Sequence, residues 1–160
     1  MEAVVDIQGF RGNFNKFIVK EFAVVSENFK AQVVFQAPYD FNTLRFPNRG
    51  TARWLTERFH YMRWDEPGMP YDEEFIRNLC SQFSVLHVRG LEKWQFLCKF
   101  HNKVYCIDFK ASEREFDDKQ RVECILPQHN CYRKNYKCAL NVASVYYRNM
   151  FPLVKNTSAN

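Results

Sequence analysis

The chain has 160 residues, of which 46% are hydrophobic and 17% aromatic, and this composition fits one globular domain with a substantial core. No apolar run approaches the roughly 18 residues of a membrane-spanning helix, and Glu2 and Asp6 interrupt any N-terminal signal sequence. We therefore expect a cytoplasmic or nuclear protein with no membrane partner, in which the six cysteines are thiols or metal ligands. The formal net charge of +5 permits an anionic partner but does not require one.

Three apolar runs open the chain and predict three consecutive strands. They cover residues 3–10, 17–25 and 31–36, and turn-forming residues separate them. The intervening turns are short, so the strands should pair as an antiparallel meander over residues 3–37.

The rest of the chain predicts alternating helices and strands. Apolar spacing and capping residues indicate helices at 51–61, 72–82, 92–100 and 137–151, with Asp72 as the cap of the second. Short apolar runs predict strands at 84–88 and 104–109. This order favours one layered α/β domain over residues 1–154, in which parallel strands extend the meander, followed by a disordered tail at 155–160.

Four of these elements carry short motifs of one known fold family. Residues 4–8 read Val-Val-Asp-Ile-Gln, residues 20–25 Lys-Glu-Phe-Ala-Val-Val, and residues 137–143 Lys-Cys-Ala-Leu-Asn-Val-Ala. The fourth is the strand and helix around Lys93. Over about residues 3–150 the chain resembles the DnaQ-like 3′–5′ exonucleases of the RNase H-like fold. The resemblance implies an RNase H-like mixed sheet, made of an antiparallel three-strand meander plus parallel strands and flanked by helices.

The resemblance also identifies the positions of a catalytic centre. In the family, several carboxylates hold two divalent ions that activate water and stabilise the leaving oxygen. At the matching positions this chain keeps Asp6, but has Gln8 for the second acid and Lys93 for the third. Lys137 and Val142 stand where the final helix has its histidine and its last acid. The expected function is therefore a catalytically silent exonuclease-like domain that binds RNA, single-stranded DNA or a nucleic-acid-handling protein.

Two other functions stay open. Asp6, Glu21 and Asp108 could converge as an alternative carboxylate set, giving an active 3′–5′ exonuclease that uses magnesium or manganese. The domain could instead be a protein-interaction module with a filled cleft. The Maelstrom domain of the small-RNA silencing machinery is a precedent by analogy for the silent scaffold, because it has the same fold without the acids and carries a metal-binding Cys/His set.

A cysteine–histidine cluster near the C-terminus predicts a structural zinc site. Cys124, His129, Cys131 and Cys138 fall within fifteen residues, and these ligand types suit tetrahedral zinc. Four protein ligands would leave no open position for catalysis. The other interpretation is that Cys124 and Cys138 are buried core thiols, while His129 and Cys131 face solvent.

A segment rich in arginine and aromatic residues predicts a nucleic-acid-binding surface. Its members are Arg53, Trp54, Arg58, Arg63 and Trp64. Guanidinium groups match phosphate geometry, and aromatic faces stack with unpaired bases. The other interpretation is an amphipathic helix whose aromatic side chains belong to the core and whose arginines are solvated.

Overall fold

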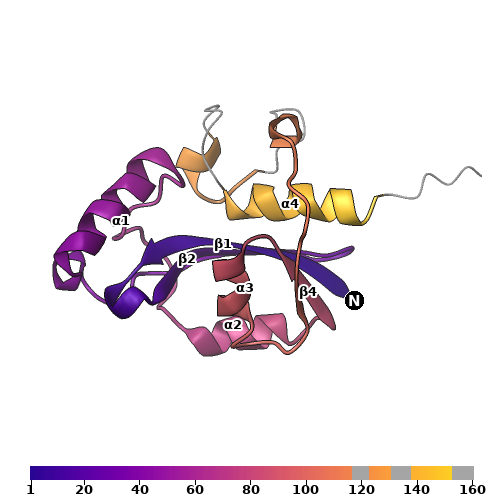
Figure 1. Ribbon diagram of the computed structural model, residues 1–160, viewed down its shortest axis with the longest axis horizontal. Coiled ribbons are helices and arrows are strands. Elements are labelled where there is room, and N and C mark those ends of the chain that lie inside the picture. The colour runs from indigo at the N-terminus through magenta and orange to yellow at the C-terminus, as the bar shows by residue number, and fades with distance from the viewer. Residues whose placement is uncertain (117–122, 131–137, 153–160) are drawn as a thin grey trace, which may run out of the picture.

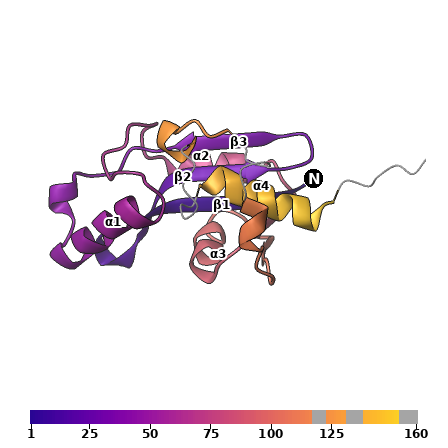
Figure 2. The ribbon, with the colours of Figure 1, turned by 90° about the horizontal axis from the view of Figure 1, so that it is seen from above.

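The computed structural model describes residues 1–116, 123–130 and 138–152. Its centre is a five-stranded mixed sheet with the strand order β3-β2-β1-β4-β5 (Figures 1 and 2). The strands are β1 (Glu2–Arg11), β2 (Phe17–Val25), β3 (Lys30–Val34), β4 (Val85–Val88) and β5 (Val104–Cys106).

The strand directions confirm the predicted mixed sheet. β1, β2 and β3 pair antiparallel in chain order, while β4 pairs parallel with β1 and β5 parallel with β4. The apolar runs of β1 and β2 are buried on both faces, which explains why they read as almost continuous hydrophobic segments. All five predicted strands therefore lie in one sheet.

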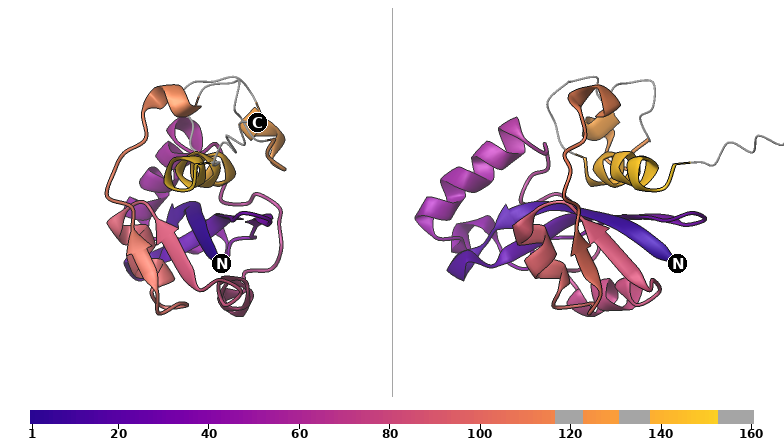
Figure 3. Two further views of the ribbon diagram at one scale, coloured as in Figure 1. Left: turned by 90° about the vertical axis from the view of Figure 1, so that its right-hand side faces the viewer. Right: turned by 45° about the vertical axis from the view of Figure 1, so that its right-hand side comes forward.

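In the described part of the chain, four α-helices flank this sheet. α4 covers one face, α2 and α3 lie against the other, and α1 stands at one end of the sheet (Figures 1 and 3). Their bounds are α1 (Phe46–Arg58), α2 (Glu73–Cys80), α3 (Leu91–Leu97) and α4 (Ala139–Met150). No helix in the described ranges combines the length and the apolar character needed to cross a bilayer.

Some element bounds differ from the predicted ones. α1 begins at Phe46 and not at 51, because Pro47 suits the first helical turn and Arg45 is still extended. β5 ends at Cys106 and not at 109, although the Ile107 amide continues the pairing with a bond to the Val88 carbonyl. Asp72 caps α2 as predicted, since its carboxylate accepts from two backbone amides. The predicted tail lies outside the described residues.

Side chains along β1 alternate between the two faces of the sheet, so its polar residues and most of its core residues lie on opposite faces. Val5 and Ile7 join the core that includes α2 and α3, whereas Val4 joins the core under α4. Asp6 and Gln8 have the same parity as Val4, so they face the α4 side of the sheet. Gln8 pairs with Glu21 of β2. The sheet register therefore brings three polar positions together beneath α4.

A candidate metal centre and a lysine–aspartate pair

Four buried side chains from three segments converge beneath the start of α4. They are Glu21 of β2, Cys124 and His129 of the segment 123–130, and Cys138 immediately before α4, and their ligand atoms lie within 4.8 Å of one another. This group contains three of the four predicted zinc ligands. The fourth predicted ligand, Cys131, lies outside the described residues.

The distances within this group suit a metal ion. The His129 Nδ1 lies 3.3 Å from the Glu21 Oε2 and 3.4 Å from the Cys124 Sγ, and that sulfur lies 3.8 Å from the same carboxylate oxygen. Ligand bonds of 2.0–2.3 Å in a tetrahedral zinc site place neighbouring ligand atoms about 3.3–3.8 Å apart. The four side chains could therefore hold one ion with little rearrangement.

Hydrogen bonds from outside the group orient its members. The His129 Nε2 bonds to the carbonyl of His60, which leaves Nδ1 directed at the other ligands. Metal-binding histidines commonly have such a backbone partner on the second ring nitrogen. Gln32 of β3 donates to the Glu21 Oε2 at 3.0 Å and to the Cys124 Sγ at 2.8 Å. The second Glu21 oxygen accepts from the amide of Ala139, the first residue of α4.

The protons within the group are those that a metal would displace. Hydrogen bonding to Cys138 lowers the pKa of Cys124, and the same bond together with burial raises the pKa of Cys138. Burial lowers the pKa of His129, but its bonds to Cys138 and Glu21 prevail and raise it to about 10. Metals bind thiolate and neutral imidazole, so binding here would release protons.

His60 links the end of α1 to β1 and to the metal group. Its Nε2 lies 2.9 Å from the Gly9 carbonyl, and its Nδ1 accepts from the Met62 amide at 3.1 Å. Both ring nitrogens of the neutral imidazole therefore have a backbone hydrogen-bond partner. Burial lowers the His60 pKa to about 4, which keeps the ring uncharged at neutral pH.

Lys93 of α3 forms an ion pair with Asp6 of β1. The Lys93 Nζ lies 2.7 Å from the Asp6 Oδ1, and the Gln8 Nε2 lies 3.1 Å from the Asp6 Oδ2. Asp6 is only 2% exposed, and both of its oxygens are engaged within the protein. Burial raises the pKa of Asp6, while the neighbouring ammonium opposes that shift. An ammonium at this distance repels a divalent cation from the carboxylate.

The alternative carboxylate set is not assembled in the described part of the chain. Glu21 belongs to the cysteine–histidine group, and Asp108 is an exposed residue after β5. Among the described residues, Asp6, Glu21 and Asp108 do not form a group that could share one ion. Val142, which the resemblance would align with the family's last acid, is a core side chain of α4, and Lys137 lies outside the described residues.

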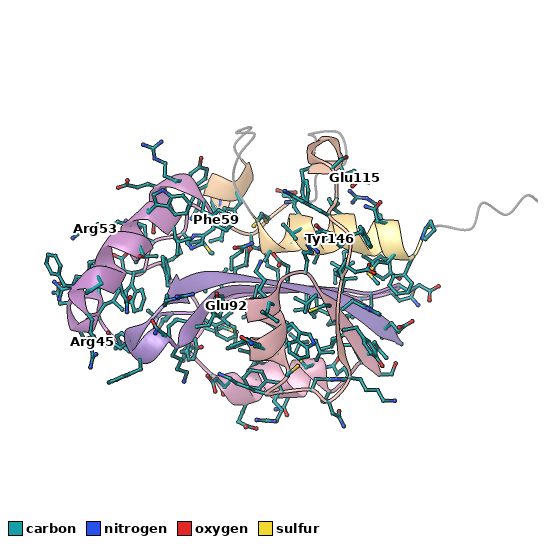
Figure 4. The ribbon with its side chains drawn as sticks, in the orientation of Figure 1. Arg45, Arg53, Phe59, Glu92, Glu115 and Tyr146 are labelled. Carbon is teal, nitrogen blue, oxygen red and sulfur yellow. The ribbon has the colours of Figure 1, made fainter. Side chains whose placement is uncertain are left out.

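The predicted nucleic-acid surface divides between core and solvent. Arg53, Trp54 and Arg58 are exposed on α1, where Figure 4 labels Arg53. The Trp54 ring stacks on Phe59 with 6.3 Å between ring centroids. Arg63 is exposed as well and lies 3.5 Å from the Asp65 carboxylate. Trp64 is 6% exposed and its indole nitrogen donates to the Tyr39 carbonyl. Trp64 is therefore a core residue, and Trp54 is the accessible indole of this set.

A cleft of about 830 Å³ lies between α1 and the loops at 36–41 and 63–67. Arg53 and Arg63 line it, together with four acidic side chains: Asp40, Glu57, Asp65 and Glu66. Lys20, buried nearby, donates to the carbonyls of Trp64 and Glu66, and burial lowers its pKa to about 8. The excess of carboxylates makes the interior of the cleft a poor site for phosphate.

Glu21, Gln32 and His60 are the members of the site that the sequence did not assign to it. One signal was available for Glu21, because a carboxylate inside the apolar run of β2 must find a buried partner. The other two act through contacts that depend on the folded loop positions.

Comparisons with protein-family models, with curated proteins and with solved structures found no significant match for this chain.

Proposed function

We propose that this chain is a non-catalytic, exonuclease-like domain that binds single-stranded RNA or DNA and contains a structural zinc centre. The observation that carries the proposal is the 2.7 Å contact between Lys93 and Asp6. In an active nuclease of this kind the carboxylate would bind a divalent ion, whereas here an ammonium neutralises it. The scaffold in this proposal is the mixed sheet of a meander plus parallel strands.

Zinc is the metal that best suits the buried group of Glu21, Cys124, His129 and Cys138. Two thiolates, one imidazole and one carboxylate form a ligand set that favours zinc over magnesium or calcium, which prefer oxygen. All four ligands come from the protein and are buried, so the ion would have no open position for water. Its role is therefore to hold β2, the segment 123–130 and α4 together.

The nucleic-acid part of the proposal depends on the exposed face of α1. Arg53 and Arg58 supply positive charge on α1, Arg63 lines the same cleft as Arg53, and Trp54 exposes 56% of its surface for stacking. This combination is typical of surfaces that bind single strands through phosphate contacts and base stacking. A partner protein that handles nucleic acid is the alternative ligand of the same surface.

Binding of a labelled single-stranded oligonucleotide, measured by fluorescence anisotropy at several salt concentrations, tests the proposal. Replacing Arg53, Arg58 and Arg63 by alanine should weaken binding by roughly tenfold or more and reduce the salt slope by about two. The matched control replaces Lys103, Lys110 and Arg148, which are exposed cations outside α1. This control removes the same charge and should change binding much less.

The outcomes separate the candidate ligands. Equal losses in both triple variants would show that only net charge matters, and the α1 surface would then have no specific role. Absence of binding by the wild-type chain to both RNA and DNA would overturn the nucleic-acid assignment.

A further inference from the structure

The turn between β1 and β2 has a backbone conformation that its sequence does not favour. Within the 3-10 turn η1 (Asn13–Asn15), Phe14 has φ 60° and ψ 27°, and Asn15 has φ 58°. Asparagine tolerates this left-handed region, but a bulky side chain such as that of phenylalanine is strained there. The strained residue is also 82% exposed, so its ring gains little from packing in the core.

The neighbouring segment of the chain fixes this turn in place. Asn13 forms three hydrogen bonds with residues that precede α1: it donates two and accepts one. The Gly12 carbonyl accepts a fourth hydrogen bond, from a side chain of α1. The partners are the Tyr39 hydroxyl, the Thr43 carbonyl, the Arg45 amide and the Asn48 side chain. A strained conformation persists when its surroundings determine it in this way, and such strain is concentrated at functional positions.

The turn presents an aromatic and basic surface beside the start of α1. The Arg45 guanidinium lies 4.5 Å from the centre of the Phe14 ring. Phe46, the first residue of α1, is 83% exposed. Figure 4 places Arg45 at the end of α1 that lies away from Tyr146 of α4. Exposed rings next to guanidinium groups are the elements that hold unpaired bases.

A basic groove adjoins the other side of the turn. It has a volume of about 490 Å³ and runs between the turn and α3. Its lining contains three cations, Arg11, Lys16 and Lys99, against one carboxylate, Glu92. The Arg11–Glu92 and Lys16–Glu73 pairs, at 3.2 and 3.3 Å, are about half exposed, and exposed pairs of this kind are weak enough for phosphate to replace them.

The charges of the two hollows decide where a phosphate backbone would lie. The larger cleft beside α1 has twice as many carboxylates as arginines, whereas the groove at the turn has an excess of cations. We propose that the β1–β2 turn is a base-stacking subsite for single-stranded nucleic acid, in which Phe14 stacks on one unpaired base and Lys16 and Lys99 contact the flanking phosphates. This inference rests on the proposed function and extends its surface from α1 to the turn.

The decisive variant is Phe14→Gly, because glycine adopts the left-handed backbone without strain and removes only the ring. It should keep the melting temperature at or above the wild-type value and weaken oligonucleotide binding by roughly tenfold. Phe14→Trp keeps an aromatic ring at this position and should bind like the wild type. Tyr105→Ala, which removes an exposed ring on β5, should leave binding unchanged. Lys16→Ala with Lys99→Ala should reduce the salt slope by roughly one to two.

An oligonucleotide with one abasic position is the second arm of the experiment. The wild-type chain should bind the abasic strand more weakly than the intact strand when the missing base is the one that stacks on Phe14. Phe14→Gly should bind the two strands equally. Wild-type affinity in Phe14→Gly would overturn the subsite while leaving the proposed function intact. Absence of binding by the wild type would remove both, and self-association abolished by Phe14→Gly would assign the turn to a second copy of the chain.

Discussion

Asp6 and Lys93 form an ion pair with unequal burial. The carboxylate is 2% exposed and the ammonium side chain is 24% exposed, so Lys93 reaches solvent while Asp6 does not. The Asp6 carboxylate has two side-chain partners, Lys93 and Gln8. Removing the lysine would leave this buried carboxylate with the Gln8 amide alone. Removing both members would leave no buried charge to neutralise.

We therefore predict that Lys93→Met lowers the free energy of unfolding by roughly 2–3 kcal/mol. The double variant Asp6→Asn with Lys93→Met should recover most of this loss, and urea denaturation of the four proteins measures the coupling. Lys103→Met, an exposed lysine, is the control and should change stability little. Additive losses in the double variant would mean that the pair does not interact energetically.

The same pair predicts the absence of metal-dependent cleavage. The wild-type chain should leave a labelled single strand intact in magnesium or manganese, because Lys93 neutralises the Asp6 carboxylate. Gln8→Glu alone should not create activity, since Lys93 stays in place. Asp6→Asn should leave strand binding unchanged or slightly stronger, because it removes one negative charge and leaves the Lys93 ammonium without its counter-charge. Divalent-dependent degradation that is lost in Asp6→Ala would falsify the silent-scaffold proposal.

Glu21 has two roles that one substitution separates. One oxygen faces His129 and Cys124, and the other accepts from the Ala139 amide at the start of α4. Glu21→Gln keeps a neutral oxygen for the helix amide but removes the anionic ligand. We expect zinc affinity to fall by at least about tenfold, while far-ultraviolet circular dichroism of the zinc-saturated protein stays unchanged. A loss of helix signal at saturating zinc would assign Glu21 mainly to the cap.

At the scale of elements, the metal group joins segments that are distant in sequence. Glu21 lies in the middle of β2, whereas Cys138 immediately precedes α4 and Cys124 and His129 lie on the segment between. An ion bound by all four side chains would therefore connect the start of α4 to β2 and to the segment 123–130. Its removal should loosen this helix and the segment 123–130 before it affects β1 or α2.

We predict that chelation lowers the melting temperature of the wild-type chain and that added zinc restores it. Ligand binding to the native state stabilises it by mass action, and structural zinc sites contribute directly to folding. Cys124→Ser should show a lower melting temperature that no longer responds to the chelator. Cys98→Ser, an exposed cysteine outside the group, should behave like the wild type. Equal responses of the two variants would contradict a specific site.

The elements themselves were predictable because their signals are local. The period-two and near-continuous apolar patterns identify all five strands, and Asp72 marks the start of α2 through its carboxylate. The predicted helix at 51–61 begins too late, because Pro47 breaks helices in most positions but fits the first helical turn of α1. Where an element begins depends on one or two capping residues, and their patterns are ambiguous.

At the scale of the whole molecule, the candidate site was only partly predictable. Cys124, His129 and Cys138 are close in sequence, so their clustering was visible. Glu21 lies 103 residues before Cys124, and only the sheet register and the docking of α4 bring it to them. The family resemblance assigned Asp6 and Lys93 to one catalytic centre, but it did not predict the contact between them across 87 residues. Long-range contacts of this kind leave no periodic signal in the sequence.

The central claim is that the molecule holds its metal at Glu21 and the cysteines, while Lys93 excludes metal from Asp6. Anomalous diffraction tests both parts at once, using crystals of protein purified without chelator and soaked in manganese. We predict one zinc peak among the ligand atoms of Glu21, Cys124, His129 and Cys138, and no manganese peak beside Asp6. A manganese peak on the Asp6 carboxylate, or no zinc peak within the buried group, would contradict the account.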